Sequence, residues 1–189
     1  MNELIEDAQY SGVDFALKKM KKGDYEGCSF TNCNFSNADI SNCMFMDCDF
    51  VDCDLSSANI TNTTFKEVVF SNCKMMGLHF QKCSSLFFSA TFTSCVLDFS
   101  SFVGRSLEPL QFSKCSLKGV NFADASMMKV IFDDCNFDQA IFEGTHLKET
   151  DLRTSFNFNI DPQTNVISKA LFSKENVSGL LKKYNIVIE

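Results

Sequence analysis

The feature that most constrains the fold of this chain is a strict five-residue period of large apolar side chains. They stand at every fifth position from Tyr25 to Phe80 and, after a shift of two residues, from Phe87 to Leu152. An α-helix repeats every 3.6 residues and a β-strand every two, so neither produces a period of five. The period therefore indicates stacked repeats, each of which buries its apolar side against its neighbours.

A second set of positions keeps the same period. Two residues before most of the large side chains stands a small or modest one, and all ten cysteines occupy this position. Ten cysteines in 189 residues raise the alternatives of a disulfide framework or zinc sites. However, no CxxC motif is present and the two histidines are isolated from any cysteine pair. We therefore expect free, buried thiols and a reducing compartment.

The repeat units resemble those of the pentapeptide-repeat family, in which a small residue, Asp or Asn, Leu or Phe and two polar residues follow one another. Ala38-Asp39-Ile40-Ser41-Asn42 and Cys53-Asp54-Leu55-Ser56-Ser57 carry this motif, and the resemblance spans about residues 23–154. It implies an all-β fold, a right-handed quadrilateral parallel β-helix with four pentapeptides in each square coil. Residues 20 apart would then lie above one another, as in the expected ladder of Phe30, Phe50 and Phe70.

Breaks in the repeat predict the domain boundaries. Residues 1–22 are expected to form an N-terminal cap, because Lys18 would otherwise fall in a buried position. Residues 23–154 would form the β-helix, and 155–189 a C-terminal segment. In that segment Ser173 is a predicted N-cap for a short α-helix over about Lys174–Lys183.

Two irregularities lie inside the repeat. Two extra residues enlarge a corner at Gln81–Leu86, and Arg105 falls in an inward-facing position. Both are either bulges that present side chains to a partner or defects that a solenoid tolerates.

The C-terminal segment carries an apolar stripe that either caps the end of the rod or joins two copies of the chain. We favour a dimer contact, because so much apolar surface on a short segment requires a covering partner. The residues expected in this interface are Val177, Leu180, Leu181, Tyr184, Ile186 and Ile188.

The sequence predicts no enzyme. Phosphate-binding glycine loops, the GxSxG nucleophile motif and HExxH are absent, and a filled rod offers no concave site. No catalytic residue, cofactor or metal ligand is therefore expected. The opening seven residues are too acidic for a signal peptide, and no apolar run approaches the length of a membrane helix. We expect a cytoplasmic protein.

The net charge of −7 is unevenly distributed. From Gly23 to Phe65 there is no lysine or arginine, although this stretch holds seven acids. Such an acidic patch either keeps the protein soluble or binds a basic groove on a partner. The residues predicted for a partner-binding acidic face are Asp39, Asp47, Asp49, Asp52 and Asp54.

Within the family, the layout is most similar to the Qnr-type quinolone-resistance proteins. The run from Cys28 to Phe35 and the tail from Asp161 to Glu189 carry this likeness. It implies a homodimer joined through the C-terminal segment, which mimics DNA and binds a type II topoisomerase without binding nucleic acid itself. Two departures are the lack of large loops and an acidic patch far from the expected dimer junction. The alternative is a scaffold or immunity-type protein with another partner.

Overall fold

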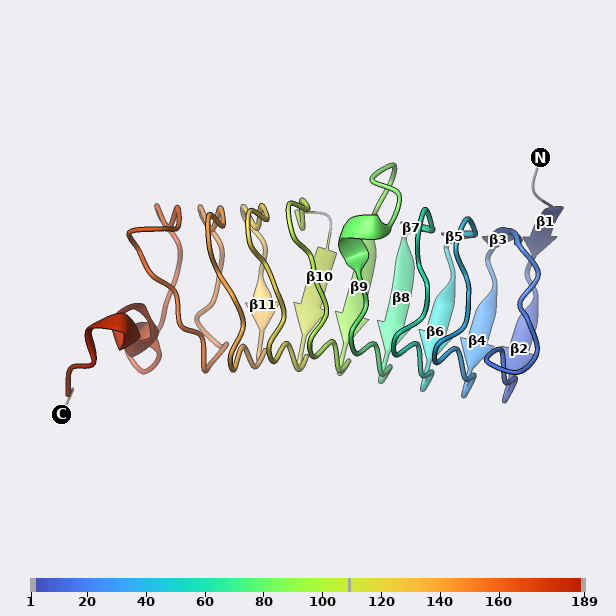
Figure 1. The fold of residues 1–189 in the computed structure, drawn as a ribbon, viewed down its shortest axis with the longest axis horizontal. Coiled ribbons are helices and arrows are strands. Elements are labelled where there is room, and N and C mark those ends of the chain that lie inside the picture. The colour runs from blue at the N-terminus through green and yellow to red at the C-terminus, as the bar shows by residue number, and fades with distance from the viewer. Residues whose placement is uncertain (1–2, 109, 188–189) are drawn as a thin grey trace.

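The protein is a straight rod built from stacked coils, with its two termini at opposite ends (Figure 1). The computed structural model describes residues 3–108 and 110–187. The strands are short, as expected when the chain turns a corner every five residues. They are β1 (Glu3–Glu6), β2 (Gln9–Ser11), β3 (Gly23–Glu26), β4 (Ser29–Thr31), β5 (Met44–Met46), β6 (Asp49–Val51), β7 (Thr64–Lys66), β8 (Val68–Ser71), β9 (Ala90–Thr93), β10 (Leu110–Ser113) and β11 (Phe132–Asp133).

All strand pairs are parallel and define the sides of the coil. The first face holds the sheet β1-β3-β5-β7, and the second face holds the seven-stranded sheet that runs from β2 to β11. The third face is a ladder of single bridges from Asp14 to Phe156, and the fourth contains the bridges from Asp39 to Asn59 and from His79 to Ile141. Paired residues are 20 apart, as between β4 and β6. The predicted quadrilateral β-helix is therefore confirmed.

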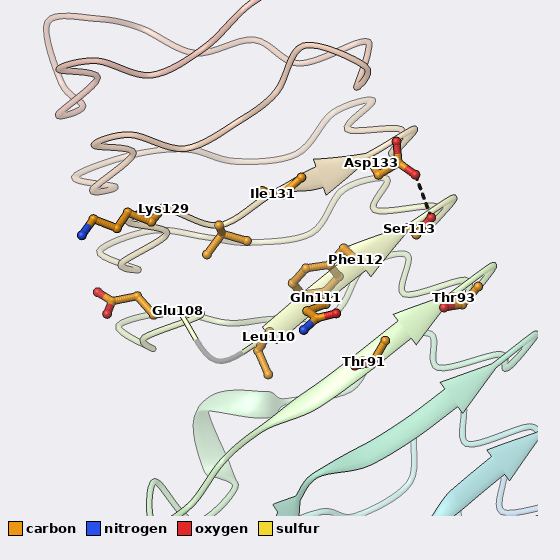
Figure 2. A pocket seen from close by; sticks show the side chains of 11 residues that line it. Thr91, Thr93, Glu108, Leu110, Gln111, Phe112, Ser113, Lys129, Ile131 and Asp133 are labelled. Atoms are coloured by element: carbon orange, nitrogen blue, oxygen red, sulfur yellow. Dashed lines mark hydrogen bonds between the residues drawn. The ribbon is translucent and has the colours of Figure 1, made fainter.

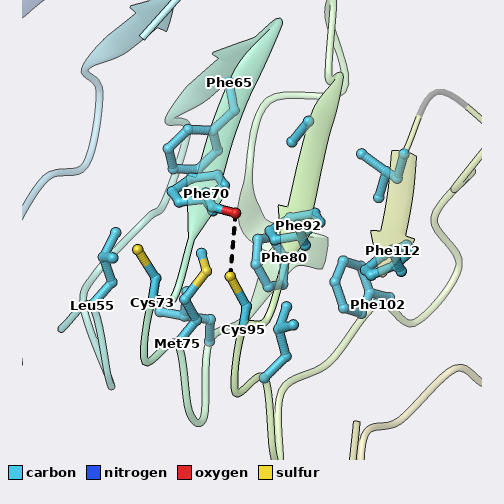
Figure 3. Close-up of a cluster of buried hydrophobic side chains, with 14 of the residues drawn as sticks. Leu55, Phe65, Phe70, Cys73, Met75, Phe80, Phe92, Cys95, Phe102 and Phe112 are labelled. Atoms are coloured by element: carbon cyan, nitrogen blue, oxygen red, sulfur yellow. Dashed lines mark hydrogen bonds between the residues drawn. The ribbon is translucent and has the colours of Figure 1, made fainter. Parts of the chain in front are cut away.

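The core is a set of vertical ladders of aromatic rings. Phe30, Phe50 and Phe70 stack with ring centroids 4.6 and 5.0 Å apart, and all three are fully buried. Figure 3 shows the continuation of this ladder through Phe92 to Phe112. Offset stacking at these separations adds to the free energy gained by burying the rings.

The thiols in the second set of positions satisfy backbone carbonyls. Cys95 Sγ donates to the Phe70 carbonyl 3.4 Å away, the bond drawn in Figure 3, and Cys73 Sγ donates to the Phe50 carbonyl at 3.3 Å. Hydroxyls do the same elsewhere, as where Thr145 Oγ1 donates to the Phe122 carbonyl. All ten cysteines are buried and free. Small hydrogen-bonding residues are thus used where a coil carbonyl faces inward.

Of the segment 1–22 expected to cap the N-terminal end, residues 1–2 lie outside the described residues, and residues 3–22 form a coil in register with the next. β1 pairs with β3, and the Tyr10 ring stacks on Phe30 at 4.9 Å. The five-residue period extends back through Met20, which is buried. The repeat would place Lys18 in a buried position, but a local turn directs its side chain to solvent. The Lys18 backbone N–H donates to the Asp14 carbonyl in this turn, and the Lys18 side chain is exposed.

The predicted enlargement at Gln81–Leu86 is present as a loop that rises from the rod beside β9 (Figure 1). A short 3-10 helix, η1 (Phe80–Lys82), begins the loop. Residues paired across the loop are 22 apart, and beyond it the spacing returns to 20. One residue was assigned wrongly. Phe87, expected in the buried series, is 62% exposed, whereas Phe88 is buried. The extra residues shift the inward position by one.

The C-terminal end also differs from expectation. The coils continue past residue 154, with bridges from His146 to Val166 and from Asp151 to Leu171. The predicted α-helix over Lys174–Lys183 is wrong, since two 3-10 helices form instead, η2 (Val177–Leu180) and η3 (Lys182–Tyr184). The α-helix does not form because the tail makes tertiary contacts with the last coil.

The tail is shaped by the end of the rod on which it packs. Asn176 Nδ2 donates to the Leu152 and Ser155 carbonyls at 2.7 and 2.8 Å. Gly179 lies so close to Phe158 that an added Cβ would be 2.4 Å from its ring. The tail therefore combines short 3-10 turns of its own with side-chain hydrogen bonds to the carbonyls of the last coil, and no α-helix forms over residues 174–183.

Candidate protein-binding surface

The corners of the coil hold side chains away from the core. Corner residues have a positive φ, for example 51° at Asp47 and 54° at Asp52. Asp and Asn tolerate this left-handed conformation better than most residues, which explains their abundance at the corners. Because coils stack at about 4.8 Å, corner residues 20 apart form continuous ridges along the rod.

Three of the five predicted acids lie around the second face. Asp47 is at the corner between the first and second faces, Asp49 is in β6 on the second face, and Asp52 is at the corner between the second and third faces. All three side chains are exposed. None of the three forms an ion pair within the described residues.

The other two predicted acids lie elsewhere. Asp54 is on the third face, half-buried, and its Oδ1 accepts a hydrogen bond from the Ser56 backbone at 2.9 Å. Asp39 is on the fourth face, where hydrogen bonds with Ser41 and with the Lys22 ammonium, 3.0 Å from Asp39 Oδ1, lower its pKa to about 2. The sequence stretch that suggested one acidic face thus winds around the rod.

The structure supplies further acids that the sequence analysis did not select. Asp7, Asp47 and Glu67 share one corner column, with Gly27 between the first two. A Cβ added to Gly27 would be 2.6 Å from Asp7 Oδ1, so the glycine leaves room for that carboxylate. Counting in steps of 20 from Asp47 would have found these residues. We call the cluster of exposed acids along this edge the acidic corner: Glu6, Asp7, Glu26, Asp47, Asp49 and Glu67.

The net charge of the whole protein resides in residues 3–71 and is strongly one-sided. On the first and second faces and the two corners that follow them, this part holds nine acids and one base, Lys66. The third and fourth faces with their corners hold three acids and four lysines. Residues 72–189 are neutral in sum. One side of the N-terminal half therefore carries all of the excess negative charge.

Beyond the acidic corner, the second face is an open groove of about 570 Å³ (Figure 2). Glu108 and Lys129 stand at one margin, and Ser113 donates a 2.9 Å hydrogen bond to Asp133 at the other. Thr91 and Gln111 lie between them. The lining mixes uncharged polar, apolar and charged side chains, and Ile131 is largely exposed in it.

All ten thiols are buried. Burial raises the pKa of the Cys48 thiol, and likewise that of Cys83, to about 12, so both are protonated at neutral pH. Across the described part of the chain, no three His, Cys, Asp or Glu side chains are grouped as metal ligands. Nor does any helix in that part have the length and apolarity to cross a membrane.

The predicted interface residues of the tail are mostly on its surface. Val177, Tyr184 and Ile186 are 41%, 52% and 56% exposed, and Leu181 is exposed at 36%. Leu180 instead turns inward and packs against the core. Ile188 lies outside the described residues.

Taken together, these features define a parallel β-solenoid with a filled interior and a one-sided charged surface. The pentapeptide repeat region family matches residues 18–85, and the family described as pentapeptide repeats (8 copies) matches residues 111–147 and 131–154. The chain belongs to the pentapeptide-repeat family.

Solved structures with the same fold include QnrB1, described as a plasmid-mediated fluoroquinolone resistance protein. A trypsin-treated variant of QnrB1 is 21% identical to this chain, with a TM-score of 0.76 over 99% of this chain and 92% of that one. The full-length form is 18% identical, with a TM-score of 0.55 over 97% and 100% of the two chains. No curated protein sequence matches this chain significantly.

Proposed function

We propose that this protein is a non-enzymatic DNA mimic that binds a type II DNA topoisomerase, gyrase or topoisomerase IV. By occupying part of the DNA-binding surface it modulates the enzyme or protects it from quinolone-like poisons. The observation that carries the proposal is the one-sided charge of residues 3–71.

The charge density of this side supports mimicry. Four coil layers at about 4.8 Å occupy roughly 19 Å of the axis. The first and second faces with their corners carry a net eight negative charges there, or about one per 2.4 Å, and double-stranded DNA carries about one per 1.7 Å. A protein groove that binds DNA is therefore a matched partner, and nucleic acid itself would be repelled. The fold shared with QnrB1, a fluoroquinolone resistance protein by its description, adds support for the choice of enzyme.

The exposed apolar residues of the tail support a homodimer. Val177, Leu181, Tyr184 and Ile186 form a contact that a second copy would cover. The free thiols fit a cytoplasmic location, where disulfides are rare.

A supercoiling assay with and without a quinolone tests the proposal. The wild-type protein is expected to change supercoiling at micromolar concentration, or to reduce quinolone-stabilised cleavage. The variant Asp47→Asn, Asp49→Asn, Glu67→Gln should bind with an association rate about 3- to 10-fold lower, because steering depends on the charge of the surface that faces the partner. A matched variant on the third face, Asp54→Asn, Asp98→Asn, Asp138→Asn, loses the same number of charges.

The matched variant is expected to bind nearly as the wild type does. Equal loss in both variants would show that only total charge matters and would refute a defined acidic side. If the wild-type protein neither binds the enzyme nor protects it from a quinolone, the topoisomerase partner is wrong. The scaffold or immunity-type function with another basic partner would then be preferred.

A further inference from the structure

Arg105 occupies a position that is otherwise reserved for small side chains. Four residues in successive coils have the same backbone hydrogen bond, in which the N–H donates to the carbonyl three residues earlier. They therefore occupy equivalent inward positions that form one column: Thr63, Cys83, Arg105 and Ala125. Thr63, Cys83 and Ala125 are buried, and Arg105 is half-buried. A guanidinium in such a column is partly removed from water, which is unfavourable for its charged form. This burial lowers the pKa of Arg105. A specific gain must offset this cost.

The inserted loop interrupts the hydrogen-bond ladder at this column. Below the loop, the Ser84 N–H donates to the Thr63 carbonyl at 3.0 Å, and above it the Ser126 N–H donates to the Arg105 carbonyl at 2.8 Å. The corresponding bond from the Ser106 N–H to the Cys83 carbonyl is missing among the described residues, next to the point where the loop leaves the coil.

The guanidinium replaces that missing bond. Arg105 Nη1 donates to the Cys83 carbonyl at 3.3 Å, and Nη2 donates to the Ser84 carbonyl at 3.0 Å. Its Cζ also lies 4.7 Å from the centre of the Phe88 ring. One side chain thus binds both ends of the loop, through two carbonyls where it leaves the coil and through a ring where it returns.

The loop held in this way presents apolar side chains to solvent. Leu86 and Phe87 are 61% and 62% exposed. Phe87 has a φ of 58°, a conformation that is unfavourable for a bulky residue. An exposed aromatic side chain on a strained backbone gains nothing for folding, whereas aromatic side chains are frequent anchors in protein interfaces.

The loop adjoins the acidic corner. The Glu67 N–H donates to Ser89 Oγ at 2.8 Å, which joins the end of the loop to the ridge. A hollow of about 280 Å³ lies between them and is lined by Lys66, Glu67, Ser85, Phe87, Phe88 and Ser89. A partner bound along the acidic corner would therefore reach the loop without a gap.

We propose that Arg105 is a positioning residue for partner binding: it holds residues 84–89 in one conformation, so that Leu86 and Phe87 form a preformed apolar contact beside the acidic corner. The occupant is an apolar pocket on the same protein whose basic groove takes the acidic corner. This inference rests on the proposed function for the partner, but its structural part can be tested on the protein alone.

The structural part is tested by amide hydrogen exchange of residues 84–89 in the full chain. Arg105→Ala is expected to raise exchange in the loop by about tenfold or more, since hydrogen bonds from a charged donor are lost. Arg105→Lys should lie between, because an ammonium cannot bind two carbonyls and stack on a ring together. Arg153→Ala, which removes an exposed arginine on the second face, is the matched control. Unchanged loop exchange in both Arg105 variants would overturn the clamp.

The binding part is tested with the topoisomerase. Leu86→Ser with Phe87→Ser, which leaves the clamp in place, and Arg105→Lys are both expected to raise Kd about tenfold or more, chiefly through faster dissociation. Normal affinity in the Leu86/Phe87 variant would refute the apolar contact even if the clamp is real. If the wild-type protein does not bind the topoisomerase, the proposed function and this contact both fail, while the exchange result still decides the role of Arg105. Should Arg105→Ala not fold, Arg105→Lys decides alone.

Discussion

Phe70 provides the sharpest test of how the rod is held together. It lies at the point where the register changes from 20 to 22 residues, and its ring is fully buried. It stacks on Phe50 at 5.0 Å and on Phe92 at 5.2 Å, so it joins the coils on both sides of the insert. Phe70→Ala removes both contacts and leaves a cavity between two coils.

The expected cost is about 4 kcal/mol, since Phe→Ala in a packed core costs about 3–5 kcal/mol. A whole domain is stable by only about 5–15 kcal/mol, so the loss should be severe. The outward-facing Phe156, 41% exposed on the third face, is the control, and Phe156→Ala should cost less than about 1 kcal/mol. Urea unfolding followed by circular dichroism, at one protein concentration, measures both free energies of unfolding.

The position of Phe70 also predicts how the variant unfolds. In a solenoid each coil contacts only its neighbours, so weakening one junction should uncouple the two halves. Hydrogen exchange should then report separate opening of the segments before and after the insert. A loss below about 1.5 kcal/mol, or one equal to that of Phe156→Ala, would refute the view that the ring ladder is the main source of stability.

Three further predictions concern the tail and the thiols. Gly179→Ala should release the tail, because the new Cβ would lie 2.4 Å from the Phe158 ring, and limited proteolysis should then remove the tail from an intact rod. Acidic substitutions at Leu181 and Tyr184 should reduce the mass in light scattering from about twice 21.3 kDa to that of one chain; an unchanged mass would mean that the tail only caps the rod. The Cys48 thiol has a pKa of about 12 in the folded protein, above its ordinary value of 9.0, so its contribution to stability is complete below pH 9 and is lost as pH rises towards 12. Urea midpoints from pH 8 to 11 should fall accordingly, and a midpoint that rises over this range would contradict the assignment.

Sequence periodicity was sufficient to predict the coil and its ladders but not their ends. The same period continues back to Tyr10, yet Lys18 concealed it, since a charge in a buried position is normally excluded. A local turn that directs Lys18 outward cannot be read from spacing. At the other end, the residues of the predicted α-helix follow carbonyls of the last coil, which are far away in sequence.

The position of the acids on the rod was only partly predictable for a related reason. Asp47, Asp49 and Asp52 were found, but Asp39 and Asp54 lie on other faces, and the acids at positions 7 and 67 were missed. A square coil rotates the outward direction by a quarter turn every five residues, so acids that are neighbours in sequence separate while those 20 apart meet. Arg105 shows the same limit: its inward position was evident, but its carbonyl and ring partners became visible only in the folded chain.

The sequence alone therefore determined the architecture, because a period of five with alternating large and small inward residues has one way to bury its apolar side chains. It also determined the excess of acid in the N-terminal half. Only the tertiary structure decided which side of the rod bears that charge, how the insert is held and how the tail ends. All three features depend on contacts between residues about 20 apart in the sequence. The energies of these contacts are set by the stacking of coils, which no local sequence pattern reveals.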